Sequence, residues 1–480
     1  MRAREVMREF RNHTGTFSLL ILLWLSAPNV SAQTVTPPVK AQAIPRRLTL
    51  EAAEQLLLQR NLTLLAARYQ IDASRAARLI AGYKPNPVLT IGAEQLALNG
   101  NFLHNLAHTD PNQAAASTYT VRVDKTIERG GKRELRTEQA DAQLKAAEAQ
   151  MLDAVRTQLF QLRQAFTAAT LARENLLLAE ATEQQYEQTA KLTEVRVENG
   201  DLAGVEIFRI RAGLLQYQQA VLQARTSYEQ AARDVLNLLG AKPDQVAAEV
   251  AAVSAESEVK FEKAALSRGN SPDQQWPDSL RLAPLEIIST FNTQPVSLSL
   301  AELRQTALSE RPDVQAARHL LDAAGYAVSL ARAQRTRDLS VGVEYQHVGS
   351  DSSVGAVVSV PLFVHNNHLA EITQAEALQK SAEAQLRQAE TQTVTDVEKA
   401  YQSYLTARRT LELYNSQNLT QMDKLRSIAA FSFREGASSL LELLDAQRSY
   451  NQAITAYNQA RADYQNSLWQ LEQAVGRSLR

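Results

Sequence analysis

Histidines are the side chains of this sequence whose spacing first suggests metal chemistry. His104 and His108 are four residues apart, and His365 and His368 are three residues apart. Either spacing would place two imidazoles on one face of a helix, where both can reach one metal ion. Both pairs, however, fall in predicted loops or strand ends, and neither has a carboxylate that completes a tetrahedral set of ligands. We therefore predict surface histidines and no metal site.

Carboxylates three residues apart form a second candidate group. Glu442 and Asp445 lie near the start of a predicted helix, so both side chains fall on one helical face. An earlier, related segment has Glu206 at the position of Glu442, but Arg209 at the position of Asp445. Taken alone, such charges are typical of the solvated face of a helix.

Motifs that would support catalysis are missing from the sequence. It has no Ser-His-Asp arrangement, P-loop, HExxH motif or Rossmann glycine pattern. Its 480 residues also include no cysteine, which excludes disulfides, thiolate metal sites and cysteine nucleophiles. We predict that the protein is not an enzyme and that it requires no cofactor.

The charge balance limits the class of partner. The sequence contains 51 basic and 52 acidic residues, which gives a formal net charge of −1. Proteins that bind nucleic acids normally carry a clear excess of basic residues. We therefore predict that nucleic acid is not a partner.

The first residues of the chain have the pattern of an export signal. A basic region ends at Arg11 and is followed by an apolar stretch over 17–25. Val30-Ser31-Ala32 then supplies the small residues of a cleavage site, so we predict a signal peptide over 1–32. No later segment approaches the ~18 apolar residues of a membrane-spanning helix. Entry of the mature protein into a membrane would therefore require β-strands.

The rest of the chain repeats one unit. The segment 48–68 matches 298–318 at an offset of 250 positions, as between Leu48 and Leu298. Further on, Gly200 matches Gly436 at an offset of 236, so the loop between the strands is longer in the first half. Each half reads as helix, strand, loop, strand, long helix, tight turn and long helix.

Alternation of apolar and polar residues predicts β-strands with one apolar and one polar or charged face. The strands lie at about 87–98, 117–127, 338–348 and 353–363. A half-buried sheet in a soluble protein would show the same pattern, but the strand lengths also suit a transmembrane barrel. Because about eight strands are the minimum for such a barrel, the second interpretation requires several chains.

Unusually long helices follow each predicted strand pair. The segment 132–197 contains neither proline nor glycine, and as a helix it would span about 100 Å. The segment after it carries apolar or small residues at alternating steps of three and four, which is a heptad seam. The seam runs through Ile207, Ile210, Leu214, Tyr217, Val221, Ala224, Tyr228, Ala231, Val235 and Leu238. The second half repeats the seam from Leu443 to Ala474, so we predict coiled-coil packing of paired helices.

These patterns divide the mature chain into four segments. Two are irregular and rich in proline: 33–47 is predicted as a tether, and 241–295 as a connector on the outside of the helices. The first repeat is 48–240, with long helices at about 131–198 and 202–240. The second repeat is 296–480, with long helices at about 367–434 and 438–476.

The ordered set of features resembles the TolC-like outer-membrane efflux protein family. It consists of the signal peptide, the duplicated unit, and a glycine-centred turn that opens into Leu440-Leu441-Glu442-Leu443-Leu444-Asp445-Ala446-Gln447. The resemblance covers nearly all of the mature chain. It implies a mainly α fold with a β-barrel portion: a homotrimer with a 12-stranded outer-membrane barrel joined to a 12-helix periplasmic α-barrel.

The resemblance also implies a function and partners. The chain would be the outer-membrane channel subunit of a tripartite, RND-type efflux system in a Gram-negative bacterium. It would contact outer-membrane lipid, a periplasmic adaptor (membrane fusion) protein and an inner-membrane RND pump. A channel of this kind conducts passively, so its mechanism would lie in pore lining, gating and docking.

Particular positions receive roles from the same resemblance. Glu442, Asp445 and Glu206 would ring the periplasmic aperture, where carboxylates attract cations. Some family members place a locking arginine where this sequence has Ser438, so that lock is missing here. The tips that would dock the adaptor carry Asn199, Gly200, Glu435 and Gly436.

Charged strand residues are expected to line the lumen of the barrel. They are Glu94, Arg122, Asp124 and Glu344. On a lipid-facing side each charge would cost about 2–4 kcal/mol at mid-depth.

One motif indicates a branch of the family. Ile127-Glu128-Arg129-Gly130-Gly131-Lys132-Arg133 resembles the signature of the cobalt-zinc-cadmium branch, with Arg129 where leucine is usual. The two glycines also suit any tight turn from a strand to a helix. We predict export of heavy-metal cations such as cobalt, zinc or cadmium. A drug or protein exporter of the same fold and a coiled-coil scaffold without a pore remain as alternatives.

Overall fold

The computed structural model describes residues 44–45, 47–94, 118–241, 285–292, 294, 299–349, 351–414 and 416–479. The predicted signal peptide lies outside these residues, as do His104, His108 and most of the tether and the connector.

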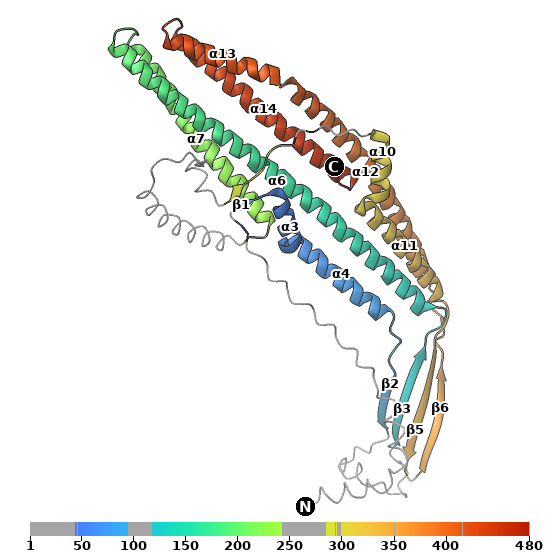
Figure 1. Cartoon of the computed structure of the whole chain (residues 1–480). Helices are drawn as coiled ribbons and strands as arrows, with labels where there is room; N and C mark the ends of the chain where they lie inside the picture. The colour runs from blue at the N-terminus through green and yellow to red at the C-terminus, as the bar shows by residue number, and fades with distance from the viewer. Residues whose placement is uncertain are drawn as a thin grey trace, which may run out of the picture. The chain divides into compact units, whose positions relative to one another are not determined.

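The first repeat begins with a two-residue strand and two helices, and it ends with two long helices (Figure 1). Its elements are β1 (Arg47–Leu48), α3 (Leu50–Arg60), α4 (Leu62–Ala81), β2 (Val88–Glu94), β3 (Thr118–Ile127), α6 (Lys132–Glu198) and α7 (Val205–Leu238). The second repeat follows the short strand β4 (Glu286–Ile287). Its elements are α10 (Leu300–Glu310), α11 (Pro312–Ala333), β5 (Leu339–Val348), β6 (Asp351–Ser359), α12 (Leu369–Leu413), α13 (Ser416–Arg434) and α14 (Leu440–Val475).

The second repeat departs from prediction within its first long helix. The sequence predicts one helix over 367–434, but the structure has two helices, α12 and α13, with an interruption at Tyr414. The backbone of Tyr414 leaves the helical region, with φ −93° and ψ 47°. Asn418 donates its side-chain amide to the carbonyl of Leu413, 2.8 Å away, and so satisfies an acceptor that the interruption exposes.

Strand β6 differs from its predicted limits of 353–363. Gly349 adopts φ 61°, so the hairpin turn is tight and pairing begins at Asp351, opposite Val348. Pro361 has no N–H to donate, and the strand ends before it, at Ser359.

The four long strands form one antiparallel sheet in the order β2-β3-β5-β6, and Figure 1 shows them side by side. The register places Leu89, Val123, Val343 and Ala356 in one row across the sheet. The neighbouring row, on the opposite face, contains Thr90, Arg122, Glu344 and Gly355. One face is therefore apolar and the other polar, and the apolar face is exposed in the single chain: Ile91, for example, is 73% exposed.

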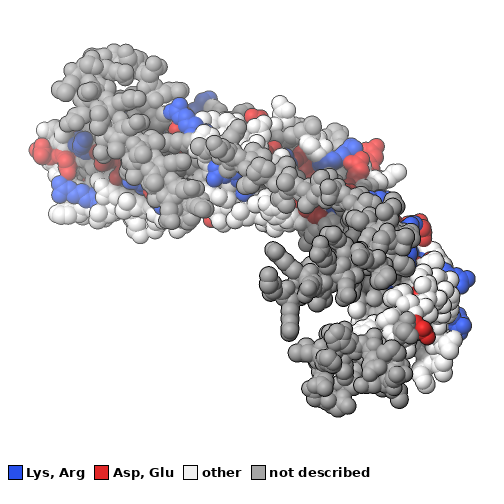
Figure 2. All heavy atoms as spheres, turned by 90° about the horizontal axis from the view of Figure 1, so that it is seen from below, with Lys and Arg blue, Asp and Glu red and all other residues white. Residues whose placement is uncertain are grey.

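Helix α6 is the central element of the helical part. It packs against α4, α7, α11 and α14. In the described part of the chain, no helix is long and apolar enough to cross a membrane. Figure 2 shows basic and acidic side chains interspersed along the face seen there, as the near-zero net charge suggests.

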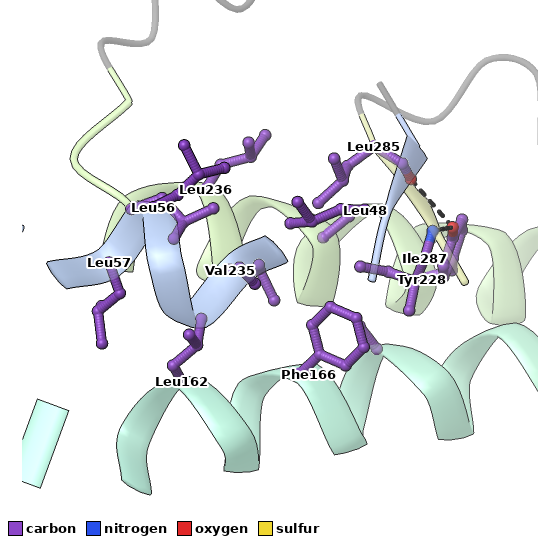
Figure 3. Packing of buried hydrophobic residues seen from close by; sticks show 14 of the residues in the cluster. Leu48, Leu56, Leu57, Leu162, Phe166, Tyr228, Val235, Leu236, Leu285 and Ile287 are labelled. Atoms are coloured by element: carbon purple, nitrogen blue, oxygen red, sulfur yellow. Dashed lines mark hydrogen bonds between the residues drawn. The ribbon is translucent and has the colours of Figure 1, made fainter. Parts of the chain in front are cut away.

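The largest buried cluster lies where the short strands meet the helices (Figure 3). Leu48 of β1 and Ile287 of β4 are paired in parallel, and both are fully buried against Phe166 of α6. The Tyr228 hydroxyl donates to the carbonyl of Leu285, 3.0 Å away, and accepts from the N–H of Ile287, 3.2 Å away. These bonds hold the end of the connector, just before the second repeat, against α7 of the first repeat.

A polar residue separates the first two helices of each repeat. Asn61, between α3 and α4, accepts a hydrogen bond from the N–H of Leu64 and caps α4. Arg311 occupies the same place between α10 and α11, where Pro312 begins the second helix. Both side chains are buried.

Candidate functional site at the hairpin tips and on the polar face of the sheet

The first helical hairpin, α6 with α7, turns at Asn199 and Gly200. Gly200 adopts φ 83°, a left-handed conformation that favours glycine. The turn is closed by two backbone bonds, from Gly200 to Val197 and from Asp201 to Arg196. A Cβ added at Gly200 would meet nothing within 4 Å. The predicted docking residues Asn199 and Gly200 are thus exposed at this tip.

The second hairpin, α13 with α14, turns at Glu435 and Gly436, which are also exposed. Gly436 has φ 77°. Ser439 caps α14 in a capping box, in which its hydroxyl accepts from the N–H of Glu442 and its own N–H donates to the Glu442 carboxylate. Glu442 therefore has a structural role that the sequence interpretation did not anticipate.

The predicted aperture residues divide between the two tips. Asp445 is exposed on α14, one turn beyond Glu442. Glu206 lies at the start of α7, where Arg209 donates to both of its oxygens at 2.8 Å. The negative charge of Glu206 is thus balanced within its own hairpin. The hydroxyl of Ser438 is buried and has no hydrogen-bond partner among the described residues.

A tie between the two tips was not anticipated from the sequence. Arg196 of α6 donates to the carbonyl of Phe433, at the end of α13, over 2.6 Å. Its guanidinium carbon also lies 5.1 Å from the centre of the Phe433 ring, which is fully buried. The second repeat has Ser432 at the position equivalent to Arg196. This difference between the two repeats is the sequence feature that could have pointed to the contact between the tips.

An apolar cluster underlies this tie. It joins Ile210 of α7 and Tyr186 of α6 to Phe433 and Leu443 of the second hairpin. The ring centres of Tyr186 and Tyr217 are 4.0 Å apart. Burial, followed by the hydrogen bond to Tyr217, raises the pKa of Tyr186, so the Tyr186 phenol stays neutral in this cluster.

Farther from the tips, the contact between the hairpins is polar. Side-chain pairs cross it from α6 to the second hairpin: Asn175 to Asn458 (3.4 Å), Thr182 to Asn451 (3.3 Å) and Gln185 to Arg426 (3.1 Å). Gln447, which is 2% exposed, has no partner for either amide atom among the described residues. This seam is held by polar side-chain hydrogen bonds, and the one that Arg426 donates is charge-assisted.

The glycine motif is explained by the junction between sheet and helices. The backbone N–H of Arg129 and the ammonium of Lys132 both donate to Asp338, each over 2.9 Å. Gly130, with φ 75°, lies so close to Thr336 that a Cβ would come within 2.9 Å of that side chain. The motif therefore fastens the start of α6 to the chain before β5. Asp338 was missed because it lies more than 200 residues away in the sequence.

The equivalent junction of the second repeat contains the predicted surface histidines. His368 precedes α12 with φ 62°, and it is the one non-glycine residue with positive φ among those described. Its Nδ1 lies 3.4 Å from a carboxylate oxygen of Glu371, and its ring packs edge-on against Phe363. His365 is exposed. Within the described residues, no three metal-ligating side chains form a group that could hold a metal ion.

The predicted lumen residues share the polar face of the sheet. Arg122 donates to Asp124 through Nε (2.9 Å) and Nη2 (2.7 Å), and it lies 3.9 Å from Glu344 on the neighbouring strand. Glu94 lies on the same face, at the far end of β2, opposite Thr118. The structure thus brings three of the four residues together and leaves Glu94 apart.

Curated relatives match most of this chain at low identity. Pyoverdine export outer membrane protein OpmQ of Pseudomonas putida is 24% identical over 468 residues, 90% of each chain. Cobalt-zinc-cadmium resistance protein CzcC of Cupriavidus metallidurans is 23% identical over 448 residues, 91% of this chain and 93% of CzcC. Alkaline protease secretion protein AprF of Pseudomonas aeruginosa is 25% identical over 323 residues, 64% of this chain, and this match spans only 58% of AprF.

Solved structures share the fold. The outer-membrane channel OprN superposes with a TM-score of 0.66 at 20% identity, over 90% of each chain. The CmeC outer membrane channel of Campylobacter jejuni has a TM-score of 0.67 at 15% identity, over 89% of this chain and 85% of CmeC. The predicted fold class, that of a TolC-like outer-membrane channel, is confirmed.

The two repeats carry the family assignment separately. Residues 53–241 and 303–477 each match the family described as Outer membrane efflux protein. Together these segments cover most of the chain, and they confirm the resemblance and the predicted location. The chain belongs to the outer membrane efflux protein family.

Proposed function

We propose that this chain is the outer-membrane channel subunit of a tripartite, RND-type efflux system and that it conducts its substrate passively. The observation that carries the proposal is the direct succession of an antiparallel sheet with an exposed apolar face and a helix of 67 residues. Such a face suits lipid, whereas a helix about 100 Å long suits the crossing of an aqueous compartment.

The sheet supports assembly into a homotrimer. Its four strands are antiparallel throughout, so the edge strands β2 and β6 run in opposite directions and can pair with each other between copies. One chain supplies too few strands for a membrane barrel, whereas three chains supply twelve.

The helices support the same assembly. On α7, the exposed residues Phe208, Leu215 and Leu222 are spaced seven apart and form one stripe. On α13, Leu425, Ile428 and Phe431 form a second exposed apolar stripe. Apolar stripes on two different helices suit a head-to-tail contact, in which α7 of one copy packs against α13 of the next and closes a ring.

Cysteine cross-linking tests this arrangement, because the chain has no cysteine of its own. Phe208 is the fourth residue of α7, and Phe431 is the fourth residue from the end of α13, so each lies about one helical turn from its tip. We expect the double variant F208C/F431C to form linked species up to trimers on oxidation, whereas each single variant forms none. Cross-linking confined to one chain, or species larger than trimers, would contradict the proposed ring.

The periplasmic aperture is proposed to lie at the tips, lined by Glu442 and Asp445. Three copies would place six carboxylates there, and Glu206 would add little because Arg209 balances it. We expect the double variant E442Q/D445N to conduct with a reduced preference for cations over anions in a planar bilayer. An unchanged preference would remove these residues from the aperture and leave the channel itself intact.

The exposed tips are proposed to dock the partners. Asn199 and Gly200 on one hairpin, and Glu435 and Gly436 on the other, would meet the hairpins of a periplasmic adaptor, which in turn binds the inner-membrane RND pump. Cysteine at Asn199 or Glu435 should cross-link to an adaptor in membranes. The exposed position Asp463, far along α14 from its tip, serves as the control and should give no such product.

The proposed substrates are heavy-metal cations such as cobalt, zinc or cadmium. The likeness to CzcC and the motif at Ile127 to Arg133 support this choice, although the motif also has the structural role described above. The second candidate is export of a drug or protein through the same fold. The likeness to OpmQ and AprF, whose names state pyoverdine export and protease secretion, supports a substrate other than a metal cation. A scaffold without a pore is the remaining alternative.

Growth of a deletion strain separates these candidates. The strain should be grown in graded zinc, cobalt, cadmium, nickel and copper beside a panel of hydrophobic drugs, with the intact gene as complement. Sensitivity confined to metals is expected. Sensitivity to drugs alone would overturn the metal assignment but keep the channel, whereas failure of the purified protein to conduct in bilayers would favour the scaffold.

A further inference from the structure

The two faces of the sheet differ in charge as well as in polarity. On the polar face, the charged strand residues are Glu94, Arg122, Asp124, Glu344 and Asp351. On the apolar face, the charged strand residue is Lys125. In the described strands, the polar face of each chain thus carries four carboxylates and a single cationic side chain, Arg122.

Arg122 occupies the middle of this face and is held between two strands. It donates to Asp124 on its own strand and faces Glu344 across the ladder at 3.9 Å. Gly342 makes this arrangement possible: a Cβ there would lie 2.3 Å from Oδ1 of Asp124, so only glycine leaves room for the carboxylate. The positive charge is therefore fixed in place beside two of the four acids.

We infer that Arg122 determines how strongly the strand section of the channel prefers cations. The inference rests on the proposed function, since the polar face surrounds a water-filled passage only in the assembled barrel. Within that passage the carboxylates of three chains attract cations, and Arg122 cancels part of their field. No ion needs to be bound at any one residue, because the effect acts through the field across the lumen.

The expected size follows from Coulomb's law. A unit charge about 10 Å away in water changes the local concentration of a monovalent ion by about twofold at low ionic strength. Loss of such a charge raises the local cation concentration and lowers the local anion concentration by about twofold each, so loss of Arg122 should raise the ratio of potassium to chloride permeability by about fourfold or more. Neutralisation of Asp124 and Glu344 together should lower that ratio by a larger factor.

Planar bilayers containing the full-length assembled protein provide the test. The tip carboxylates lie in series with the strands, so all variants are made in the E442Q/D445N background. The permeability ratio is measured from the reversal potential in a potassium chloride gradient for R122Q, R122K and D124N/E344Q. K125Q is the matched control, because it removes a positive charge from the same strand but on the opposite face.

We expect R122Q to raise the ratio, D124N/E344Q to lower it, and R122K and K125Q to leave it unchanged. The differences should disappear at about 1 M salt, where the Debye length is about 3 Å. An unchanged ratio in R122Q, or equal shifts in R122Q and K125Q, would overturn the inference. Absence of conducting channels from the unmodified protein would instead overturn the proposed function.

Discussion

In the first repeat, Asn61 donates its side-chain amide to the carbonyl of Leu238, 2.8 Å away, at the end of α7. In the second repeat, Arg311 donates to the carbonyl of Ala474, 3.3 Å away, at the end of α14. Leu238 and Ala474 are 236 positions apart, which is the offset of the repeat. One contact is therefore made by a neutral amide in one repeat and by a guanidinium in the other.

The charged version requires further partners. Arg311 is 3% exposed, so its charge must be compensated inside the protein, and Asp313 (2.6 Å) and Asp396 (3.1 Å) provide this. Asn61 needs only neutral groups, such as the Gln158 side chain at 2.9 Å. The stability of this contact therefore depends on ion pairs in the second repeat, whereas in the first repeat it depends on neutral hydrogen bonds.

The helical hairpins of the two repeats also differ, in the continuity of their first helix. Helix α6 is continuous over 67 residues, whereas its counterpart is interrupted at Tyr414 and its last segment, α13, is held to α6 by Arg196 and Arg426. The second hairpin therefore depends on the first for the position of its tip. If the tips form the proposed aperture, the second hairpin is the one that we expect to move when it opens.

Removal of Arg311 should have the largest effect on stability. R311A removes the cation that pairs with both Asp313 and Asp396, and we expect a loss of about 3–5 kcal/mol, whereas N61A should cost about 1–3 kcal/mol. Thermal unfolding of both variants in detergent measures the difference. Equal losses of stability in R311A and N61A would show that the charge of Arg311 makes no additional contribution to stability.

Acid should weaken the second repeat selectively. Burial alone would raise the pKa of Asp313, but the hydrogen bond and charge of Arg311, with Arg156, hold that pKa below its usual value. The stabilisation is therefore present above about pH 3.9 and is lost as pH falls through the lower, folded pKa. The gap in melting temperature between the unmodified protein and D313N should narrow below about pH 4. A gap that stays constant down to pH 2 would contradict this account.

Loss of Arg196 should loosen the second tip. R196A removes a charge-assisted hydrogen bond worth about 1.5–3 kcal/mol, and the channel should open more often in bilayers. R211A is the control, because Arg211 pairs with Glu194 within the first hairpin and, among the residues that the structure describes, forms no ion pair with the second hairpin. Equal behaviour of the two variants would exclude Arg196 from gating.

The two tip glycines offer a finer test of the same tie. Both have positive φ, so alanine at either position should cost about 1–2 kcal/mol of backbone strain. Only at Gly436 would the new Cβ also approach Arg196, at 3.2 Å from Nη2, because Gly200 has open space. G436A should therefore raise the open probability, and G200A should not. The same open probability in G436A and G200A would show that backbone strain, and not the approach to Arg196, causes any change.

The smallest effect is expected at the junctions before α6 and α12. Gly131, with φ 69°, begins α6 without strain, whereas His368 adopts φ 62° at the same place before α12. H368G should stabilise the protein by up to about 1 kcal/mol, and G131A should destabilise it by about as much. Denaturant titration measures both, with H365G as an exposed control. Destabilisation by H368G would mean that the contact with Glu371 outweighs the strain.

Much of the architecture could be predicted because the strands and helices have characteristic periodic patterns of apolar residues. Alternation with period two identified the strands, and the heptad seam identified the paired helices. The duplication identified two equivalent halves, and together these patterns were enough to recognise the family. The exact ends were less predictable: Gly349 and Pro361 set the limits of β6, and Tyr414 divides a helix whose apolar spacing is continuous.

Other features depend on residues that are distant in the chain. Arg196 and Phe433 are separated by 237 positions, and Arg129 and Asp338 by 209, so no local pattern links them. The close approach of Asp124 to Gly342 depends on the register between β3 and β5. A shift of one residue in that register would place the side chains of one strand on the opposite face. The sequence by itself therefore determined the elements, their order and the family. Only the tertiary structure decided which hairpin holds the other and which charges share a face, because these depend on long-range register and packing.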